Sequence, residues 1–225
     1  MSILIKDAEE LVELSRNYNV ALVVGHVLLF HPAIKKIKKI ISTGKIGEMQ
    51  YIYSNRLNLG QVRTEENVFW SLAPHDIAIF QYLIEQYPEK VHSMGSSFLQ
   101  KGIQDLTMTH LKYSNGVEGH IFVSWLHPFK EHRLVVVGSE GMISFEDSIK
   151  DKPLKIYSKK FDITNGIPEK IDGPVELVHY KKKMPLTAEM EYFINNLDNK
   201  NLKTANVYHA LDVIKILVEA SEQIN

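Results

Sequence analysis

Apolar residues recur three and four positions apart in five stretches of the chain, a spacing that predicts five helices. The expected helices begin near Asp7, Pro32, Pro74, Pro185 and Thr204. Each of these residue types favours a helix start, since aspartate and threonine accept hydrogen bonds at the N-cap and proline fits the first turn. The fourth helix is expected to bury an apolar stripe made of Met190, Phe193, Ile194 and Leu197.

Alternating apolar and polar residues predict strands over much of the middle of the chain. The expected strands cover residues 49–57, 90–98, 105–113, 117–125, 132–138 and 142–146. Asn115-Gly116 lies between two of them and is the strongest hairpin signal in the chain. Residues 147–183 are rich in lysine and are expected to be irregular, with turns at Asn165-Gly166 and Asp172-Gly173.

Short turns join most of these strands, so the sequence predicts an α+β fold with a largely antiparallel open sheet and helices on one face. The opposite face would be apolar at Met49, Tyr51, Tyr53 and Phe122, or at the alternate positions. Soluble proteins rarely leave a large apolar face in water. We therefore expect a homo-oligomer in which a second copy of the chain covers this sheet face.

The run from Val20 to Val24 is continuously apolar, as in a strand that is buried on both faces of a parallel sheet. One helix and one such strand cannot form a parallel sheet by themselves. Residues 1–26 are therefore expected to belong to a larger domain, and residues 27–225 to form a second domain.

The composition excludes several classes of protein. The 225-residue chain has 26 lysine and arginine residues against 27 aspartate and glutamate residues, so it lacks the basic surplus of nucleic-acid-binding proteins. It has no cysteine, which excludes disulfides, iron–sulfur clusters and cysteine nucleophiles. The longest apolar stretch, residues 20–30, is too short to cross a membrane, and no secretory leader is visible. We expect a cytoplasmic protein with no membrane partner.

Histidine is the residue type in this sequence that best suits metal binding or proton transfer. The spacing of His120, His127 and His132 selects no metal site, and we expect none. His75 lies at the expected start of a helix, where the amide dipoles disfavour a positive imidazolium, and a neutral imidazole accepts a proton from an alcohol near pH 7. Asp76 acts in the opposite direction, so the sequence does not fix the sign of the pKa shift of His75. A histidine that caps the helix or lies in the core is the alternative interpretation.

Two polar segments flank this histidine in the sequence. The first carries Arg56, Asn58, Arg63 and Asn67. Two guanidiniums and two amides suit a phosphorylated or carboxylated ligand with many hydroxyls, and surface ion pairing with Glu65 and Glu66 is the alternative. The second segment, residues 125–133, contains Lys130 and by itself indicates a structural role.

Taken together, short segments along the whole chain resemble the glucose–fructose oxidoreductase / inositol dehydrogenase / MocA family of NAD(P)-dependent dehydrogenases. The matching segments are Asp7-Ala-Glu-Glu-Leu-Val-Glu-Leu, Val24-Gly-His26, Phe30-His-Pro32, Gly44-Lys-Ile-Gly47, Arg56-Leu-Asn-Leu-Gly60, Leu72-Ala-Pro-His-Asp76, Ser124-Trp125, Pro128-Phe-Lys130 and Val136-Val-Gly-Ser-Glu-Gly141. Each segment is short, but their order and spacing are specific. The region from Arg56 to Asp76 is most similar to the nucleotide-sugar branch of the family.

The resemblance implies a domain order. Family members begin with a Rossmann domain that carries a glycine-rich dinucleotide fingerprint and a Glu-Lys-Pro segment, and the sequence contains neither. Residues 1–26 resemble the last helix and strand of that domain, and residues 27–225 resemble the substrate-binding and oligomerisation domain. Three positions depart from the family pattern: Ser71 stands for an aspartate, Leu29 for an arginine and His127 for an acidic residue.

For function, the resemblance implies a domain of a sugar or nucleotide-sugar dehydrogenase, with His75 as the catalytic acid/base. The implied substrate contacts are Arg56, Asn58, Arg63, Asn67, Asp76 and Lys130, with His26 towards the cofactor. NAD or NADP is the cofactor of a complete member, and without the fingerprint this chain by itself is expected to bind it weakly and to catalyse nothing. The alternative is a non-catalytic assembly or ligand-binding module, which Ser71 favours.

Overall fold

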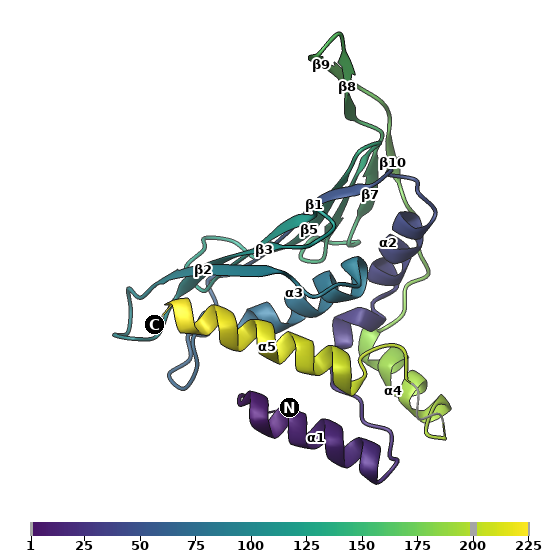
Figure 1. Ribbon diagram of the computed structural model, residues 1–225. Coiled ribbons are helices and arrows are strands. Elements are labelled where there is room, and N and C mark those ends of the chain that lie inside the picture. The colour runs from purple at the N-terminus through teal and green to yellow at the C-terminus, as the bar shows by residue number, and fades with distance from the viewer. Residues whose placement is uncertain (1, 199–201, 225) are drawn as a thin grey trace.

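The computed structural model describes residues 2–198 and 202–224 (Figure 1). Its main element is an eight-stranded sheet in the order β10-β7-β6-β5-β1-β4-β3-β2. The strands are β1 Met49–Leu57, β2 Lys90–Ser96, β3 Leu106–Lys112, β4 Glu118–Ser124, β5 Glu131–Gly138, β6 Met142–Glu146, β7 Leu154–Tyr157 and β10 Val175–Leu177. β1 is parallel to β4, and the other neighbouring pairs are antiparallel. The predicted sheet is confirmed.

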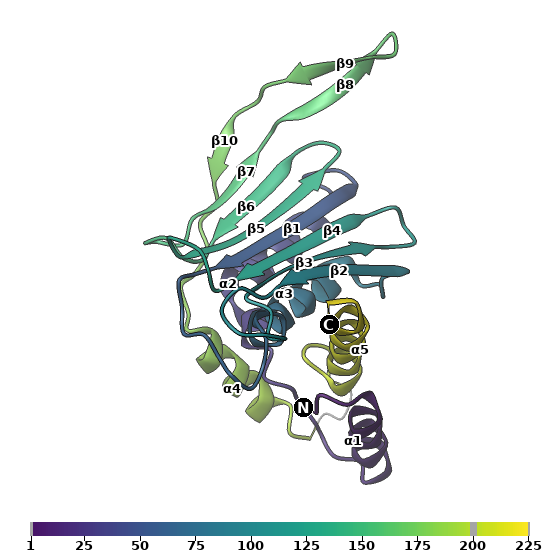
Figure 2. The same cartoon turned by 90° about the vertical axis from the view of Figure 1, so that its left-hand side faces the viewer.

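Helices lie on one face of this sheet, and the described residues leave the other face uncovered (Figures 1 and 2). They are α1 Ile5–Asn17, the 3-10 helix η1 Val27–Phe30, α2 Pro32–Ser42, α3 Val68–Ile84, α4 Pro185–Asn195 and α5 Val207–Ile224. α3 and α5 pack directly on the sheet, α1 packs on α5, and α4 lies beside η1. The α+β arrangement predicted from the sequence is therefore confirmed.

The core lies between the sheet and α3. Ile52 of β1, Ile121 of β4 and Phe80 of α3 are all completely buried. Gly119 of β4 makes this contact close, because a Cβ atom there would lie 2.9 Å from the side chains of both Ile52 and Phe80. A glycine at this strand position lets the helix approach the sheet more closely than any other residue would.

Asn115-Gly116 forms a hairpin as predicted, and the turn predicted at Asn165-Gly166 forms a second hairpin. Gly116 has a φ of 83° and joins β3 to β4, and Gly166 has a φ of 80° and joins β8 Lys160–Thr164 to β9 Ile167–Ile171. The expectation that residues 147–183 are irregular is wrong in part, since β7, β8, β9 and β10 lie there. The β8–β9 hairpin projects beyond the edge of the sheet (Figure 2). Most of its side chains are exposed, so no buried face imposes an apolar alternation on the sequence.

Three predicted helix starts are wrong by a few residues. α1 begins at Ile5, and Asp7 lies inside its first turn. α3 begins at Val68 because the side-chain oxygen of Asn67 accepts the Trp70 N–H at 3.1 Å, so Pro74 lies within the helix. At α5, the side-chain oxygen of Asn206 accepts the N–H of His209 at 2.9 Å, in place of the expected cap at Thr204.

The predicted burial of the apolar stripe on the fourth helix is wrong at three of its four residues, and Phe193 is half-buried. Met190, Ile194 and Leu197 are 47%, 62% and 53% exposed, and Glu189 is the buried residue of this helix. α4 lies at the side of the domain, where Tyr192 packs on Phe30 of η1. An apolar helix face is buried only where another element reaches it, and no described element covers this one.

The strand expected at residues 20–24 is reduced to a single bridge between Val23 and Asn206. Val20 is 54% exposed, and the Val24 N–H donates to the carbonyl of Ala205 at 3.1 Å. A parallel strand needs a neighbouring strand for its backbone groups, and the described residues offer none at this position. The division into residues 1–26 and 27–225 stays a prediction.

Candidate functional site

A buried ion pair joins the sheet to α3. The Arg56 guanidinium donates from Nε to Oδ2 of Asp76 at 2.7 Å and from Nη2 to Oδ1 at 3.0 Å. The two side chains are only 10% and 4% exposed. Burial by itself lowers the pKa of Arg56, but the charge and hydrogen bonds of Asp76 outweigh it and the pKa is raised. Two residues predicted as substrate contacts are thus engaged with each other.

The space beside this ion pair is small. A cavity of about 20 Å³ is lined by the pair and by His31, His132 and Asp147 among others. His132 Nδ1 lies 3.4 Å from Nη1 of Arg56, and burial together with Arg56 and Lys130 lowers the pKa of His132 to about 4. A cavity of this size holds a water molecule but no sugar. This region holds α3 against the sheet and does not form a ligand pocket of its own.

His75 precedes Asp76 and lies in the interior of α3. The prediction that it stands at the helix start is wrong, because Asn67 caps α3. Its pKa is nevertheless lowered, first by burial and then by Arg56, with Asp76 opposing. Its Nδ1 is buried and has no hydrogen-bond partner within the described part of the chain. His75 is therefore neutral near pH 7, which is the state that a general base requires.

His26 and His209 lie next to this helix. Their rings meet edge to face, with centroids 5.5 Å apart and an angle of 78° between the planes. His209 Nε2 lies 3.1 Å from the carbonyl oxygen of Ala78 in α3. Burial, followed by His209 and His75, lowers the pKa of His26 to about 3. Sequence reasoning missed His209, because its contact with Ala78 spans 131 residues and has no local signal.

His26 also faces a hollow of about 180 Å³ beside α3. Trp70 and Pro74 of α3 line the same hollow, together with apolar residues of α5. His26, predicted to face the cofactor, thus lies close to the segment that carries His75. His26 shares this hollow with Pro74, the neighbour of His75 in the sequence.

Arg63 and Asn67 share a different, open hollow of about 780 Å³ between the 61–67 loop and residues 102–103. Arg63 is 59% exposed and pairs with Glu66 at 3.2 Å, which agrees with the surface ion pairing considered as an alternative. Both ends of the Asn67 amide are engaged, since its Nδ2 donates to the Gln104 side chain at 3.0 Å. Arg63 is the polar group in this hollow that is best placed to meet a ligand.

Asn58 and Lys130 lie at the end of the sheet where β1 and β4 finish. The Asn58 N–H donates to the carbonyl of Ser124 at 3.1 Å, and its side chain is half-buried beside Gly60. Lys130 is exposed in the turn before β5. Among the described residues, no single pocket collects all the predicted contacts. They form two groups. The inner group lies on or beside α3 and consists of His26, Arg56, His75 and Asp76. The outer group lies on loops and consists of Asn58, Arg63, Asn67 and Lys130.

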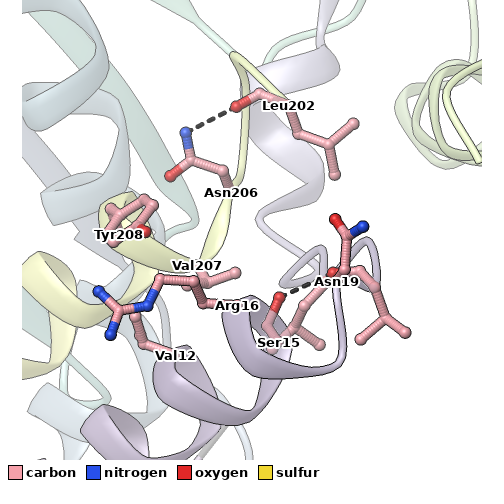
Figure 3. Close-up of a pocket in the computed structure, with 10 residues that line it drawn as sticks. Val12, Ser15, Arg16, Asn19, Leu202, Asn206, Val207 and Tyr208 are labelled. Atoms are coloured by element: carbon pink, nitrogen blue, oxygen red, sulfur yellow. Dashed lines mark hydrogen bonds between the residues drawn. The ribbon is translucent and has the colours of Figure 1, made fainter. Parts of the chain in front are cut away.

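A further pocket, of about 270 Å³, lies between α1 and the start of α5 (Figure 3). Arg16, Asn206 and Tyr208 are among its lining residues. None of the predicted site residues lines it. Elsewhere in residues 2–198 and 202–224, no three histidine or carboxylate side chains are grouped so that they would hold a metal ion.

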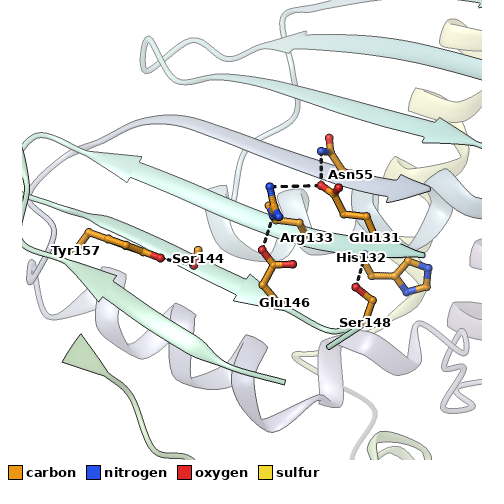
Figure 4. A network of polar contacts seen from close by, with 8 residues as sticks. All are labelled: Asn55, Glu131, His132, Arg133, Ser144, Glu146, Ser148 and Tyr157. Atoms are coloured by element: carbon orange, nitrogen blue, oxygen red, sulfur yellow. Dashed lines mark hydrogen bonds and ion pairs between the residues drawn. The ribbon is translucent and has the colours of Figure 1, made fainter. Parts of the chain in front are cut away.

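The uncovered sheet face is polar at one end and aromatic at its centre. At the polar end, Asn55 donates to Glu131 at 2.7 Å, and Arg133 pairs with Glu131 and Glu146 (Figure 4). At the centre, the Tyr53 ring stacks on that of His120, with centroids 5.1 Å apart. Tyr51, Tyr53 and Phe122 lie on this face, as predicted, whereas Met49 precedes an irregularity in β1 and packs against the core.

An open, mostly antiparallel sheet that is backed on one face by helices defines the class of this chain as an α+β domain. Residues 34–144 match the family described as the GFO/IDH/MocA C-terminal domain. Residues 34–144 carry the match to this family, and the resemblance seen in the sequence is confirmed.

Relatives of known activity include two sugar dehydrogenases. UDP-N-acetylglucosamine 3-dehydrogenase of Acidithiobacillus ferrooxidans is 23% identical over 84% of this chain and 58% of its own length. D-xylose 1-dehydrogenase [NADP(+)] of Haloarcula marismortui is 23% identical over 99% of this chain and 64% of its own. The chain spans about half the length of the curated relatives that it matches.

A solved structure of the Acidithiobacillus ferrooxidans UDP-N-acetylglucosamine 3-dehydrogenase superposes with a TM-score of 0.83. The match covers 99% of this chain and 68% of that chain at 20% identity. At this identity the superposition shows that the two chains share a fold. It carries no statement about the substrate of this chain.

Proposed function

We propose that this chain is the substrate-binding and oligomerisation domain of an NAD(P)-dependent dehydrogenase that acts on a sugar or a nucleotide sugar. The observation that carries the proposal is His75, a half-buried imidazole with a lowered pKa, on the helix that the Arg56–Asp76 ion pair joins to the sheet. The names of the relatives support a sugar substrate and a nicotinamide cofactor.

The chemistry assigned to this chain is the handling of one proton. In a complete dehydrogenase of this type a bound nicotinamide would supply the hydride acceptor for the carbon that carries the hydroxyl group. The hydroxyl proton then has to leave, and a neutral imidazole with an available lone pair accepts it. His75 holds the required protonation state because burial and the nearby Arg56 disfavour its charged form.

The described residues do not provide a cradle for the cofactor pyrophosphate. Such a cradle needs a glycine-rich turn between a strand and the N-terminus of a helix. The residues before η1 form an isolated bridge at Val23 and no strand, and α2 begins at Pro32, which has no N–H to offer. His26 is the one predicted cofactor contact, and no step is assigned to it. We therefore propose that this chain by itself binds NAD(H) weakly and turns over nothing.

The charged part of the substrate is assigned to the outer group of residues. Arg63 lines the open hollow with most of its side chain exposed, so a phosphate or carboxylate can replace Glu66 as its partner. Lys130 is exposed in the turn before β5, and Asn58 is half-buried directly after β1. Arg56 contributes through Asp76 and the position of α3.

The oligomer is assigned to the uncovered sheet face. Met94 and Met108, paired across β2 and β3, are 58% and 45% exposed on it, beside Phe122 of β4. The β8–β9 hairpin adds exposed apolar side chains at Phe161 and Ile163, 62% and 75% exposed. A two-stranded hairpin is marginally stable in water by itself, so contact with a second copy would also stabilise this projection.

Two titrations on the full chain test the proposal. A library of UDP-sugars and free sugars should include at least one that raises the melting temperature, and Arg63→Ala should weaken that shift. Lys170→Ala, on the distant hairpin, is the matched control. No shift with any ligand, or an equal shift in Arg63→Ala, would contradict the assigned substrate pocket. Calorimetry should show no micromolar binding of NAD(H), and micromolar binding would overturn that part of the proposal.

One observation favours a non-catalytic assembly module instead. Arg56 and Asp76, two of the implied substrate contacts, are satisfied by each other, while the apolar sheet face is open. A chain that oligomerises but binds no sugar in the titration above would support this second function.

A further inference from the structure

Three histidines form a continuous row across the uncovered face of the sheet. His92 of β2 lies directly opposite His110 of β3, and His110 lies directly opposite His120 of β4. The residues before and after each histidine in its strand are buried, so all three side chains point to the uncovered face. Directly opposite side chains have Cβ atoms about 4.5–5.5 Å apart, and these three strands lie side by side (Figure 2). His92, His110 and His120 are called the histidine row below.

Neighbouring side chains hold two of these rings in place. The His120 ring stacks on that of Tyr53 of β1, with centroids 5.1 Å apart and an angle of 9° between the planes. Nδ1 of His120 is also hydrogen-bonded to the Tyr51 hydroxyl group. Nε2 of His110 lies 3.1 Å from Oε2 of Glu118. The row is therefore an ordered part of the sheet surface.

The charges beside the row do not offset further positive charge. Lys90, Lys112 and Glu118 lie next to the row on the same three strands. Lys112 pairs with Glu118 at 3.7 Å, and Lys90 lies opposite Lys112. Neutral side chains also flank the row: Tyr51, Tyr53, Met94, Met108 and Phe122. Protonated histidines would thus add like charges to a region that has more lysine than glutamate.

A second copy of the chain suits this face while the histidines are neutral. Charges of both signs lie on the face and pair within one copy, since Lys112 pairs with Glu118, and Arg133 pairs with Glu131 and Glu146. A face with both signs can meet an identical face without strong repulsion. In a two-fold interface the same patch is present on both sides, so each histidine of the row occurs twice.

We propose that the histidine row makes the association of two copies through the sheet face depend on pH. Neutral histidines allow the two faces to meet near pH 7.5, and protonated histidines weaken the contact near pH 5.5. Histidine is the side chain on this face whose ordinary range of titration falls between these values. The inference rests on the proposed function, because it adds a form of regulation to the sheet face to which the oligomer is assigned.

The sign of the effect follows from burial. His120 is already half-buried in one copy, and burial, followed by the charge of His110, lowers its pKa. A second copy would remove more water from the row and bring further histidines close, and both changes disfavour the charged form. The separated copies then bind more protons than the complex, so association weakens as the pH falls. One imidazole with an ordinary pKa of about 6.5 that has to release its proton on association weakens it about tenfold at pH 5.5.

Sedimentation velocity of the full chain, over a range of concentrations at pH 7.5 and pH 5.5, tests the proposal without cofactor or sugar. The dissociation constant of the wild-type complex should rise at least about tenfold at pH 5.5. The triple variant His92→Gln, His110→Gln, His120→Gln has a neutral row at both pH values and should lose most of this dependence. His179→Gln, an exposed position after the last strand, is the matched control and should keep it. Circular dichroism checks the fold, and the same comparison at pH 6.0 decides if a chain unfolds at pH 5.5.

Three results would overturn the proposal, and they separate it from the proposed function. A wild-type chain that associates equally at both pH values would exclude regulation by the row and leave the assigned interface in place. A triple variant that weakens as much as the wild type would assign the pH dependence to other groups. If the triple variant does not fold or associate, His110→Gln decides by the same criterion. A wild-type chain that is monomeric at pH 7.5 at every concentration would overturn the assigned interface, and this inference with it.

Discussion

Arg56 and Asp76 lie 20 residues apart in the sequence and form a two-pronged ion pair that is almost completely buried. The pair fixes α3 to β1 next to His75. Its importance is structural, because any movement of α3 would also displace the histidine and the loop that carries Arg63. The first prediction concerns this pair.

Replacing Arg56 by methionine should lower the free energy of unfolding by about 3–5 kcal/mol, because Asp76 would be left as a buried charge without a partner. Urea denaturation at pH 7 measures this loss. Arg63→Met is the control, since the exposed Arg63–Glu66 pair contributes about 0–1 kcal/mol. Similar small losses in both variants would mean that the buried pair does not hold α3 in place.

Gly119→Ala should force α3 and the sheet slightly apart and so lower the free energy of unfolding. A Cβ atom at this position would lie 2.9 Å from side-chain atoms of both Ile52 and Phe80, so we expect a loss of about 1–3 kcal/mol. Thermal and urea denaturation measure the effect. Gly25→Ala is the matched control, because a Cβ atom there meets nothing within 4 Å, and it should be nearly neutral. A stable Gly119→Ala chain would show that this contact adapts freely.

The uncovered sheet face should hold the oligomer together. Met108→Glu places a charge between Met94 and Phe122, and we expect it to reduce the mass of the particle in analytical ultracentrifugation. Leu14→Glu on α1 is the control, since Leu14 is 41% exposed and Met108 is 45% exposed. A wild-type chain that sediments as a monomer at all concentrations would refute the interface. So would a Met108→Glu chain with unchanged mass.

The buried histidines should make the fold sensitive to acid. His26 and His132 have folded-state pKa values of about 3 and about 4, below the ordinary value of 6.5. Above pH 6.5 neither state binds these protons and stability is fully present. Between pH 6.5 and 4 the unfolded chain binds protons that the folded chain does not, so stability falls as pH drops, by up to about 1.4 kcal/mol per pH unit for each histidine.

Urea denaturation at intervals from pH 7 to pH 5 checks this dependence. His132→Asn should have a shallower slope than the wild type over this range. The exposed residue His179 provides the control, and His179→Asn should reproduce the wild-type slope. A wild-type slope in His132→Asn would show that other groups cause the acid sensitivity.

Local signals in the sequence predicted most of the fold. Proline begins α2 and α4, and Asn115-Gly116 joins β3 to β4, because each signal acts through the backbone of its own residues. Where several signals compete, the sequence does not choose among them. Pro74 suited a helix start, but Asn67 provides the cap and the proline lies inside α3.

The candidate site was less predictable than the fold. The sequence grouped Arg56 with Arg63 because they lie close in the chain, whereas the structure pairs Arg56 with Asp76 beneath the sheet and leaves Arg63 on an exposed loop. His209 was missed entirely, since its contacts with His26 and Ala78 depend on how α5 packs against α3. Contacts between distant segments leave no local pattern.

The sequence by itself determined the α+β class, the strands up to residue 146, the face of the sheet on which Tyr53 and Phe122 lie, and the family. These properties follow from the alternation of apolar and polar residues, from turn residues and from the order of short segments, all of which are local features of the sequence. The tertiary structure alone decided that α4 keeps an exposed apolar stripe, that β8 and β9 project from the sheet, and that His75 is neutral. Burial and electrostatic fields depend on which distant elements surround a residue, and only the packed chain defines that surrounding.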